Sequence, residues 1–262
     1  KLDQPFAWSQ RWTDVRSVIN IKVFTDDGIV GWGEAFGYVS WKTVKTSIDE
    51  MISPSIIGRE INSPEDIHKL VYELQKTFHI FGRYGITIFA LSGIEIGLWD
   101  ALGKEKNVPL YKLIDGGEKK EFKAYASLFR YSDKKIVEKK CKESIDKGFK
   151  IIKLHEITNE CIEAARKFLG DKITLMTDVN CAWTLDEIIE NQDFLKKMNL
   201  YWVEEPVFPP EDFEKLSKIK NELGIKIAAG ENACTSFEFK KMFEAEAVDY
   251  AQPSVTKVGG IT

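Results

Sequence analysis

The sequence has few cysteines, and they lie too far apart to suggest a disulfide framework or a zinc site. Cys141, Cys161, Cys181 and Cys234 form no CxxC pair. Two of them fall on helical patterns, which favours buried free thiols in a reducing compartment. We therefore predict a cytoplasmic protein rather than a small disulfide-stabilised secreted domain.

The sequence also lacks a long apolar run, a signal peptide and a run of basic residues. No stretch of roughly 18 apolar residues suggests a membrane span. The formal net charge of −4 gives no reason to expect a nucleic acid or a membrane surface as partner. What remains is an ordinary composition, 44% hydrophobic and 30% charged over 262 residues, which suffices for one large domain or two smaller ones.

Three acidic residues organise the chain. Asp178, Glu204 and Glu231 each follow a short apolar run that is typical of a buried parallel strand, about one strand-plus-helix unit apart. In a β/α barrel the ends of such strands lie on one rim, where active sites form. Three carboxylates repel one another unless a cation neutralises them, and oxygen ligands suit Mg²⁺. The alternative is that each acid is a solvated strand end or a helix N-cap.

Residues 1–115 predict an α+β domain. Residues 17–24 and 29–34 alternate like two strands, and an Asp-Gly turn joins them into an antiparallel hairpin. Apolar residues at helical spacing then predict three helices, at 43–54, 64–78 and 87–104.

From about residue 122 strands and helices alternate, which predicts parallel strands with right-handed crossovers. Strands are expected at 122–128, 150–155, 173–178, 201–204, 225–229 and 248–252. Ser132 is expected to cap the first helix, and Thr184 with Glu187 forms a capping box for a later one.

Six strands predict an incomplete TIM-type barrel over residues 116–262, because a closed barrel has eight. The chain begins without methionine and stops after the sixth strand, so we expect a piece of a longer protein whose C-terminal part is not present. The predicted fold class is α/β, with an α+β domain followed by a (β/α) barrel.

Several short motifs together resemble the enolase superfamily, in its branch of mandelate racemase and muconate lactonizing enzyme. They are Lys153-Leu154-His155, Asp178-Val179-Asn180, Glu204-Glu205-Pro206, Gly230-Glu231-Asn232 and Lys257-Val258-Gly259-Gly260. The first domain resembles the capping domain of that family, with Gly31 to Glu34 on its hairpin.

The resemblance implies that Asp178, Glu204 and Glu231 bind Mg²⁺. Glu205 and Asn232 would be neighbouring groups that support the ligands or the substrate. The metal would bind a substrate carboxylate and stabilise the enediolate that forms when the α-proton leaves, the chemistry known for this superfamily.

Lys153 and His155 are the expected acid–base groups. Side chains alternate along a strand, so both point to the same face, and Asp178 and Asn180 share a face by the same rule. Next to a metal and out of water, the pKa of Lys153 is expected to fall toward that of a usable base. The alternatives are a structural ion pair for Lys153 and a hydrogen-bonded rim histidine for His155. Which of the two is the base stays open.

Four further positions bear on the site. The resemblance places Tyr38 and Trp41 on a loop over the active site, although they could equally form a surface aromatic cluster. Ser254 stands where the family usually has an Asp or a Lys, and serine is not a base at neutral pH. Lys257 fits the family pattern as a structural residue, and a role at the site is left open.

These observations predict a Mg²⁺-dependent lyase or isomerase acting on a small carboxylate, with a sugar-acid dehydratase preferred. The alternatives are a racemase or epimerase, including a dipeptide epimerase, and a cycloisomerase. From other classes, Lys153 could form a Schiff base in an aldolase, or the protein could bind without catalysing a reaction. A homo-oligomer is left open.

Overall fold

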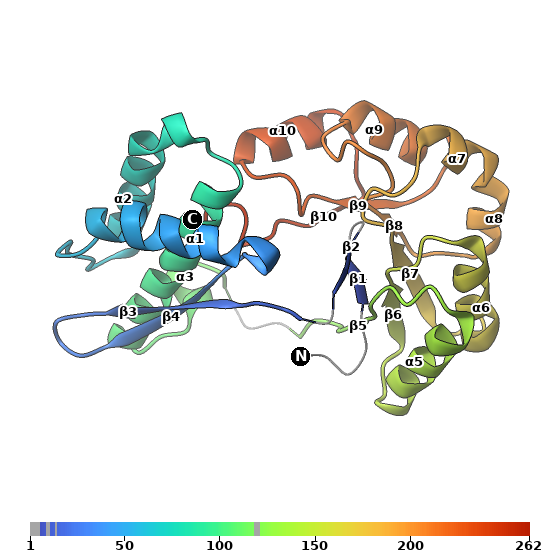
Figure 1. The fold of residues 1–262 in the computed structure, drawn as a ribbon, viewed down its shortest axis with the longest axis horizontal. Coiled ribbons are helices and arrows are strands. Elements are labelled where there is room, and N and C mark those ends of the chain that lie inside the picture. Colours follow the sequence, from blue (N-terminus) through green and yellow to red (C-terminus); the bar gives the residue numbers. More distant parts are fainter. Residues whose placement is uncertain (1–5, 9–10, 14, 118–120) are drawn as a thin grey trace. The chain divides into compact units, whose positions relative to one another are not determined.

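The computed structural model in Figure 1 describes residues 6–8, 11–13, 15–117 and 121–262. They form two compact units that interleave in sequence. The sheet unit comprises the described parts of Lys1–Arg16, Phe122–Asn232 and Phe237–Gln252, and the hairpin unit those of Ser17–Glu121, Ala233–Ser236 and Pro253–Thr262. The predicted domains, 1–115 and 116–262, are continuous in sequence, and their bounds stay a prediction.

The sheet unit is built on six parallel strands whose spatial order follows the sequence. The strands are β5 (Ala126–Ser127), β6 (Ile151–Leu154), β7 (Thr174–Asp178), β8 (Val203–Glu204), β9 (Ile227–Ala229) and β10 (Tyr250–Ala251). Each strand pairs in parallel with the next, which confirms the predicted β/α architecture. A separate antiparallel pair, β1 (Phe6–Trp8) and β2 (Arg11–Thr13), was not predicted.

Helices connect the strands and cover the outside of the sheet (Figure 1). They are α5 (Lys134–Asp146), α6 (Asn159–Leu169), α7 (Leu185–Glu190), α8 (Gln192–Lys197), α9 (Phe213–Asn221) and α10 (Ser236–Glu244). The predicted capping box at Thr184 and Glu187 is confirmed. The predicted cap at Ser132 is wrong: Asp133 caps α5 by accepting from two backbone N–H groups, and Ser132 adopts a φ of 56°.

Strand β6 separates a hydrophobic face from a polar face. Ile152 and Leu154 are almost fully buried and pack in one cluster with Val137 and Cys141 of α5. Burial raises the pKa of the Cys141 thiol to about 12, so the thiol stays protonated. Lys153, which lies between these two residues on β6, is thereby turned to the opposite side of the sheet.

The hairpin unit joins an antiparallel strand pair to a small helical bundle. The strands are β3 (Ile19–Phe24) and β4 (Val30–Ala35), and the α-helices are α1 (Trp41–Ser47), α2 (Pro64–Thr77), α3 (Ile86–Glu105) and α4 (Leu110–Leu113). Short turns of other helix types lie at Tyr38–Ser40, Ile48–Ile52, Ser53–Ser55 and His79–Phe81. The predicted helix at 43–54 is thus an α-helix that continues as a π-helix and a 3₁₀ turn.

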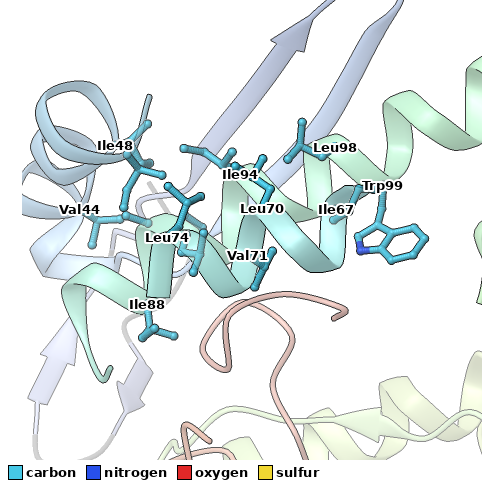
Figure 2. Close-up of a cluster of buried hydrophobic side chains, with 14 of the residues drawn as sticks. Val44, Ile48, Ile67, Leu70, Val71, Leu74, Ile88, Ile94, Leu98 and Trp99 are labelled. Atoms are coloured by element: carbon cyan, nitrogen blue, oxygen red, sulfur yellow. The ribbon is translucent and has the colours of Figure 1, made fainter. Parts of the chain in front are cut away.

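Glycines let β4 lie directly on α3. A Cβ atom at Gly33 would stand 1.9 Å from the carbonyl oxygen of Gly93, and one at Gly31 would stand 2.0 Å from that of Gly97. Figure 2 shows the apolar core of this unit, where residues of α2 such as Leu70 face α3. The close approach of the two backbones requires glycine at positions 31 and 33.

Helix α3 is the core helix of the hairpin unit. Its 20 residues are long and apolar enough to cross a membrane by length and composition. Most of the helix is buried within the unit, however, and the core helices of soluble domains pass the same test.

A buried carboxylate on α3 binds the last residues of the chain. Glu95, which is 0% exposed, accepts hydrogen bonds from the backbone N–H groups of Ile261 and Thr262, both at 2.7 Å. The indole N–H of Trp99 donates to the same carboxylate at 2.6 Å. These bonds explain why Pro253–Thr262 belongs to the hairpin unit.

Candidate active site

The polar face of the sheet unit gathers a lysine and two carboxylates. Asp178 and Glu204 are paired in register at the ends of β7 and β8, and both are almost fully buried. The Nζ atom of Lys153 lies 2.6 Å from Glu204 Oε1 and 3.3 Å from Asp178 Oδ2. One ammonium group therefore bridges two buried carboxylates.

The three charges shift one another's pKa values. Burial alone would lower the pKa of Lys153, as expected from the sequence, but Asp178 and Glu204 outweigh it and raise that pKa above its ordinary value. Burial would likewise raise the pKa of Asp178, but the hydrogen bond and charge of His155, together with Lys153, hold it well below its usual range. In this arrangement Lys153 is an ammonium and Asp178 a carboxylate.

Glu204 differs from Asp178. Burial and the negative charge of Asp178 raise the pKa of Glu204 to about 7, although Lys153 acts in the opposite direction. Its Oε2 atom accepts a hydrogen bond of 3.0 Å from the indole N–H of Trp202. Sequence reasoning missed Trp202, although it lies two residues before Glu204 within the strand that the sequence predicts at 201–204, where alternation puts both side chains on one face.

The imidazole of His155 is held at both nitrogens. Its Nδ1 atom is hydrogen-bonded to the carbonyl oxygen of Leu128, and its Nε2 atom lies 3.2 Å from Asp178 Oδ2. A carbonyl oxygen only accepts, so Nδ1 carries a hydrogen. Because Asp178 is an acceptor as well, the ring meets both contacts when both nitrogens are protonated. Nε2 is then the nitrogen with a proton to give on the side of the acids.

Two amides support the acids. The backbone N–H and the Nδ2 of Asn180 donate to Asp178 Oδ1 at 3.0 and 2.9 Å. The Nδ2 of Asn232 donates to Glu205 Oε1 at 2.7 Å. Asn180 lies beyond the end of β7, and it reaches Asp178 through a turn with a φ of 46° rather than by alternation along the strand; Glu205 is paired with Asn232.

Glu231 follows β9 and belongs to the same electrostatic neighbourhood. Burial raises the pKa of Cys181 to about 12, and the charges of Glu205, Asp178 and Glu231 add to this effect. Across the described residues, no three His, Cys, Asp or Glu side chains are arranged as a metal-ligand group. The ammonium of Lys153 lies between Asp178 and Glu204 instead.

A cation fits between these carboxylates. The Lys153 ammonium shows that the space accepts a positive charge in contact with one oxygen of each acid. The donors on offer are carboxylate oxygens, which are the ligands that Mg²⁺ prefers.

Three predicted site residues lie in the hairpin unit. Tyr38 has a φ of 40° and its ring lies 4.6 Å from that of Phe36, while Trp41 begins α1. The Nζ of Lys257 lies 4.8 Å from the ring centre of Phe36, a cation–π contact. A role of these three residues at the site stays a prediction.

Two family profiles match the chain. The profile described as mandelate racemase / muconate lactonizing enzyme, N-terminal domain, matches residues 1–115, and the one described as enolase C-terminal domain-like matches residues 137–262.

Curated relatives carry out several reactions. The chain is 33% identical to arabinonate dehydratase of Saccharolobus solfataricus, over 94% of this chain and 67% of that protein. It is 28% identical to D-galactarolactone cycloisomerase of Agrobacterium fabrum, over 100% of this chain and 70% of that protein. It is also 28% identical to N-succinyl-L-Arg/Lys racemase of Bacillus cereus, over 99% and 70%. The chain thus spans about two thirds of the length of these relatives.

Solved structures have a similar fold over nearly the whole of this chain. An enolase superfamily member from Polaromonas sp. JS666 has a TM-score of 0.87 and 32% identity, over 100% of this chain and 70% of that one. A variant of L-talarate/galactarate dehydratase, solved with magnesium and L-glucarate, has a TM-score of 0.88 and 27% identity, over 99% and 68%.

Proposed function

This chain belongs to the enolase superfamily, in its mandelate racemase and muconate lactonizing enzyme branch, and from that membership we propose that it dehydrates a sugar acid. The relatives are lyases and isomerases. Arabinonate, D-xylonate and L-talarate/galactarate dehydratases are among them, which supports the choice of reaction. The proposal includes a cytoplasmic location, because these relatives are metabolic enzymes.

The observation that carries the proposal is that Lys153 and His155 reach Asp178 together from the end of one strand. A racemase takes a proton from one face of the α-carbon and returns one to the other face, so it needs groups on opposite sides. Ser254 stands where the family usually places an Asp or a Lys that serves the opposite side. Dehydration needs acid and base on one side only, which suits this pair.

Each of the two side chains has a distinct task. Lys153, as the free amine, takes the α-proton of the substrate, and His155 donates its Nε2 proton to the departing β-hydroxyl. The α C–H bond and the β C–O bond break, water leaves, and the remaining enol converts to a 2-keto acid. The contact of Nδ1 with Leu128 keeps the ring oriented while Nε2 works.

Asp178, Glu204 and Glu231 are the residues that would hold Mg²⁺. A Mg²⁺ ion held by these residues would supply positive charge at the oxygens of the substrate carboxylate, where negative charge develops as the α-proton leaves. Similar proteins have been solved with magnesium, which supports this metal. A cation bound to Asp178 and Glu204 would also offset the negative charge that favours the ammonium form of Lys153.

Cycloisomerisation is the second candidate. Two relatives, D-galactarolactone cycloisomerase and 3,6-anhydro-α-L-galactonate cycloisomerase, are 28% and 29% identical to this chain. That reaction also begins with removal of an α-proton next to a carboxylate, so the same residues would serve it.

The test is a screen of sugar acids for a 2-keto product, with Mg²⁺ and again with EDTA. We expect one or a few acids to give the product with Mg²⁺ and none with EDTA. Asp178→Asn is expected to abolish turnover, whereas Asp171→Asn, a change at an exposed position before β7, should not. Full turnover in EDTA would overturn the metal assignment, and lactone opening or closure without a 2-keto product would favour the cycloisomerase.

A further inference from the structure

Arg130 lies buried behind the acid–base pair. It follows β5, is 4% exposed, and its backbone forms an isolated bridge with Ala7. Its Nε donates to the carbonyl oxygen of His155 at 2.7 Å, and its Nη2 donates to that of Val179 at 3.3 Å. One guanidinium group thus ties together the segments that follow β6 and β7.

The same guanidinium sets the orientation of an amide. Arg130 Nη2 donates to Asn180 Oδ1 at 3.2 Å, so the Oδ1 end of this amide faces the arginine. The Nδ2 end then faces Asp178 Oδ1, to which it donates. The second oxygen of Asp178 is left for Lys153 and His155. Hydrogen bonds thus link Arg130 through the Asn180 amide to the Asp178 carboxylate, whose Oδ1 atom also accepts from the backbone N–H of Asn180.

Glu156 fixes the segment that carries Arg130. Its carboxylate is 1% exposed and accepts hydrogen bonds from the backbone N–H groups of Tyr131 and Ser132, at 2.7 and 3.1 Å. Burial lowers the pKa of Arg130, but the charges of Glu156 and Asp178 oppose that shift. Two sets of contacts therefore fix Arg130. Glu156 binds the backbone of the two residues that follow Arg130, and the Arg130 guanidinium donates to carbonyl groups after β6 and β7.

We propose that Arg130 is a positioning residue of the active site, which aligns the Asp178 carboxylate through Asn180 and places His155 through its carbonyl group. This rests on the proposed function, in which Asp178 binds Mg²⁺ and His155 is the acid. Groups that orient a metal ligand typically change metal affinity or activity by about 10- to 100-fold when they are altered.

A second buried arginine provides the matched control. Arg166 is 7% exposed and donates hydrogen bonds to four backbone carbonyl groups, those of Met198, Asn199, Gly170 and Ile173. Lysine cannot reproduce the planar fork of either arginine. Arg130→Lys and Arg166→Lys therefore make the same chemical change at two places. Arg130 contacts the candidate active site, whereas Arg166 lies on α6 and contacts residues after α6 and α8 and just before β7.

The experiment measures Mg²⁺ affinity by calorimetry, melting temperature, and the separate values of kcat and KM for wild type and both variants. For Arg130→Lys we expect Mg²⁺ binding and kcat to fall by about 10- to 100-fold with KM unchanged. We expect both variants to lower the melting temperature by a similar amount, and Arg166→Lys to leave Mg²⁺ affinity and kcat unchanged. Equal effects of the two variants on Mg²⁺ affinity and kcat, or none from Arg130→Lys, would overturn the proposal.

A second variant keeps the test decisive if Arg130→Lys does not fold. Asn180 has a φ of 46°, which glycine adopts readily, so Asn180→Gly removes the amide that Arg130 orients without straining the backbone. We expect the same fall in Mg²⁺ affinity, and an unchanged affinity would refute the role of this amide. Wild type that binds no Mg²⁺ would defeat the proposed function itself, whereas wild-type binding with an unaffected Arg130→Lys defeats only this inference.

Discussion

Removing the ammonium of Lys153 should destabilise the sheet unit and make it depend on a metal ion. In Lys153→Met the side chain keeps its length but loses the charge that bridges Asp178 and Glu204, which are 2% and 3% exposed. Breaking a buried ion pair in this way costs about 3–5 kcal/mol, because it leaves charge buried without compensation.

Mg²⁺ should restore most of that loss. A ligand that binds only the folded state adds about 2.7 kcal/mol at a concentration of 100 times its Kd. The assay is denaturant unfolding in EDTA and again with saturating Mg²⁺. Lys150→Met, at an exposed position just before β6, is the control and should change the free energy of unfolding by less than about 0.5 kcal/mol.

Two outcomes would refute this reasoning. If Lys153→Met unfolds in EDTA at the wild-type denaturant concentration, the ammonium does not neutralise the two carboxylates. If Mg²⁺ leaves the stability of the variant unchanged, those carboxylates do not bind it.

Three further changes test neighbouring parts of the account. Trp202→Phe removes a donor to a carboxylate, which should cost about 1.5–3 kcal/mol of stability and weaken Mg²⁺ binding in calorimetry; unchanged binding would exclude a role for the indole. Because the folded pKa of Glu204 is about 7, above its ordinary value of 4.5, its contribution to stability is lost as pH rises between these values. Glu204→Gln should flatten that part of the stability–pH curve in EDTA, and an unaltered slope would contradict the shift. Gly33→Ala should cost at least about 1–3 kcal/mol in denaturant unfolding, because its Cβ would clash with the Gly93 carbonyl, and a neutral result would argue against the close packing of β4 on α3.

Much of the polar face could be predicted from the chain because strand alternation is a local rule. It put Lys153 and His155 on one face before any contact was known. It did not account for Asn180, which lies beyond the end of β7 and reaches Asp178 through a turn. It could not show that one ammonium bridges two acids, because that depends on the register of three strands. Nor could it reveal Arg130, which sits in an irregular segment after β5 where no periodic pattern marks a side chain as buried.

Local competition explains the errors at helix ends. Ser132 and Asp133 are adjacent and both are good N-cap residues, so sequence alone cannot choose between them. The structure uses Asp133, because Ser132 takes a left-handed φ that lets its N–H reach Glu156. Glu95 is a similar case: an acid among the apolar residues of α3 gives no hint that its partners are backbone groups far along the chain.

The most direct test of the central claim is exchange of the substrate α-proton with D₂O, followed by NMR in wild type, Lys153→Ala and His155→Asn. We expect wild type to form the 2-keto product, Lys153→Ala to lose both exchange and product, and His155→Asn to lose product yet retain some exchange, because removing the acid leaves the first step possible. Exchange that survives in Lys153→Ala, or rapid interconversion of two α-epimers by wild type without dehydration, would contradict a one-sided pair of Lys153 and His155.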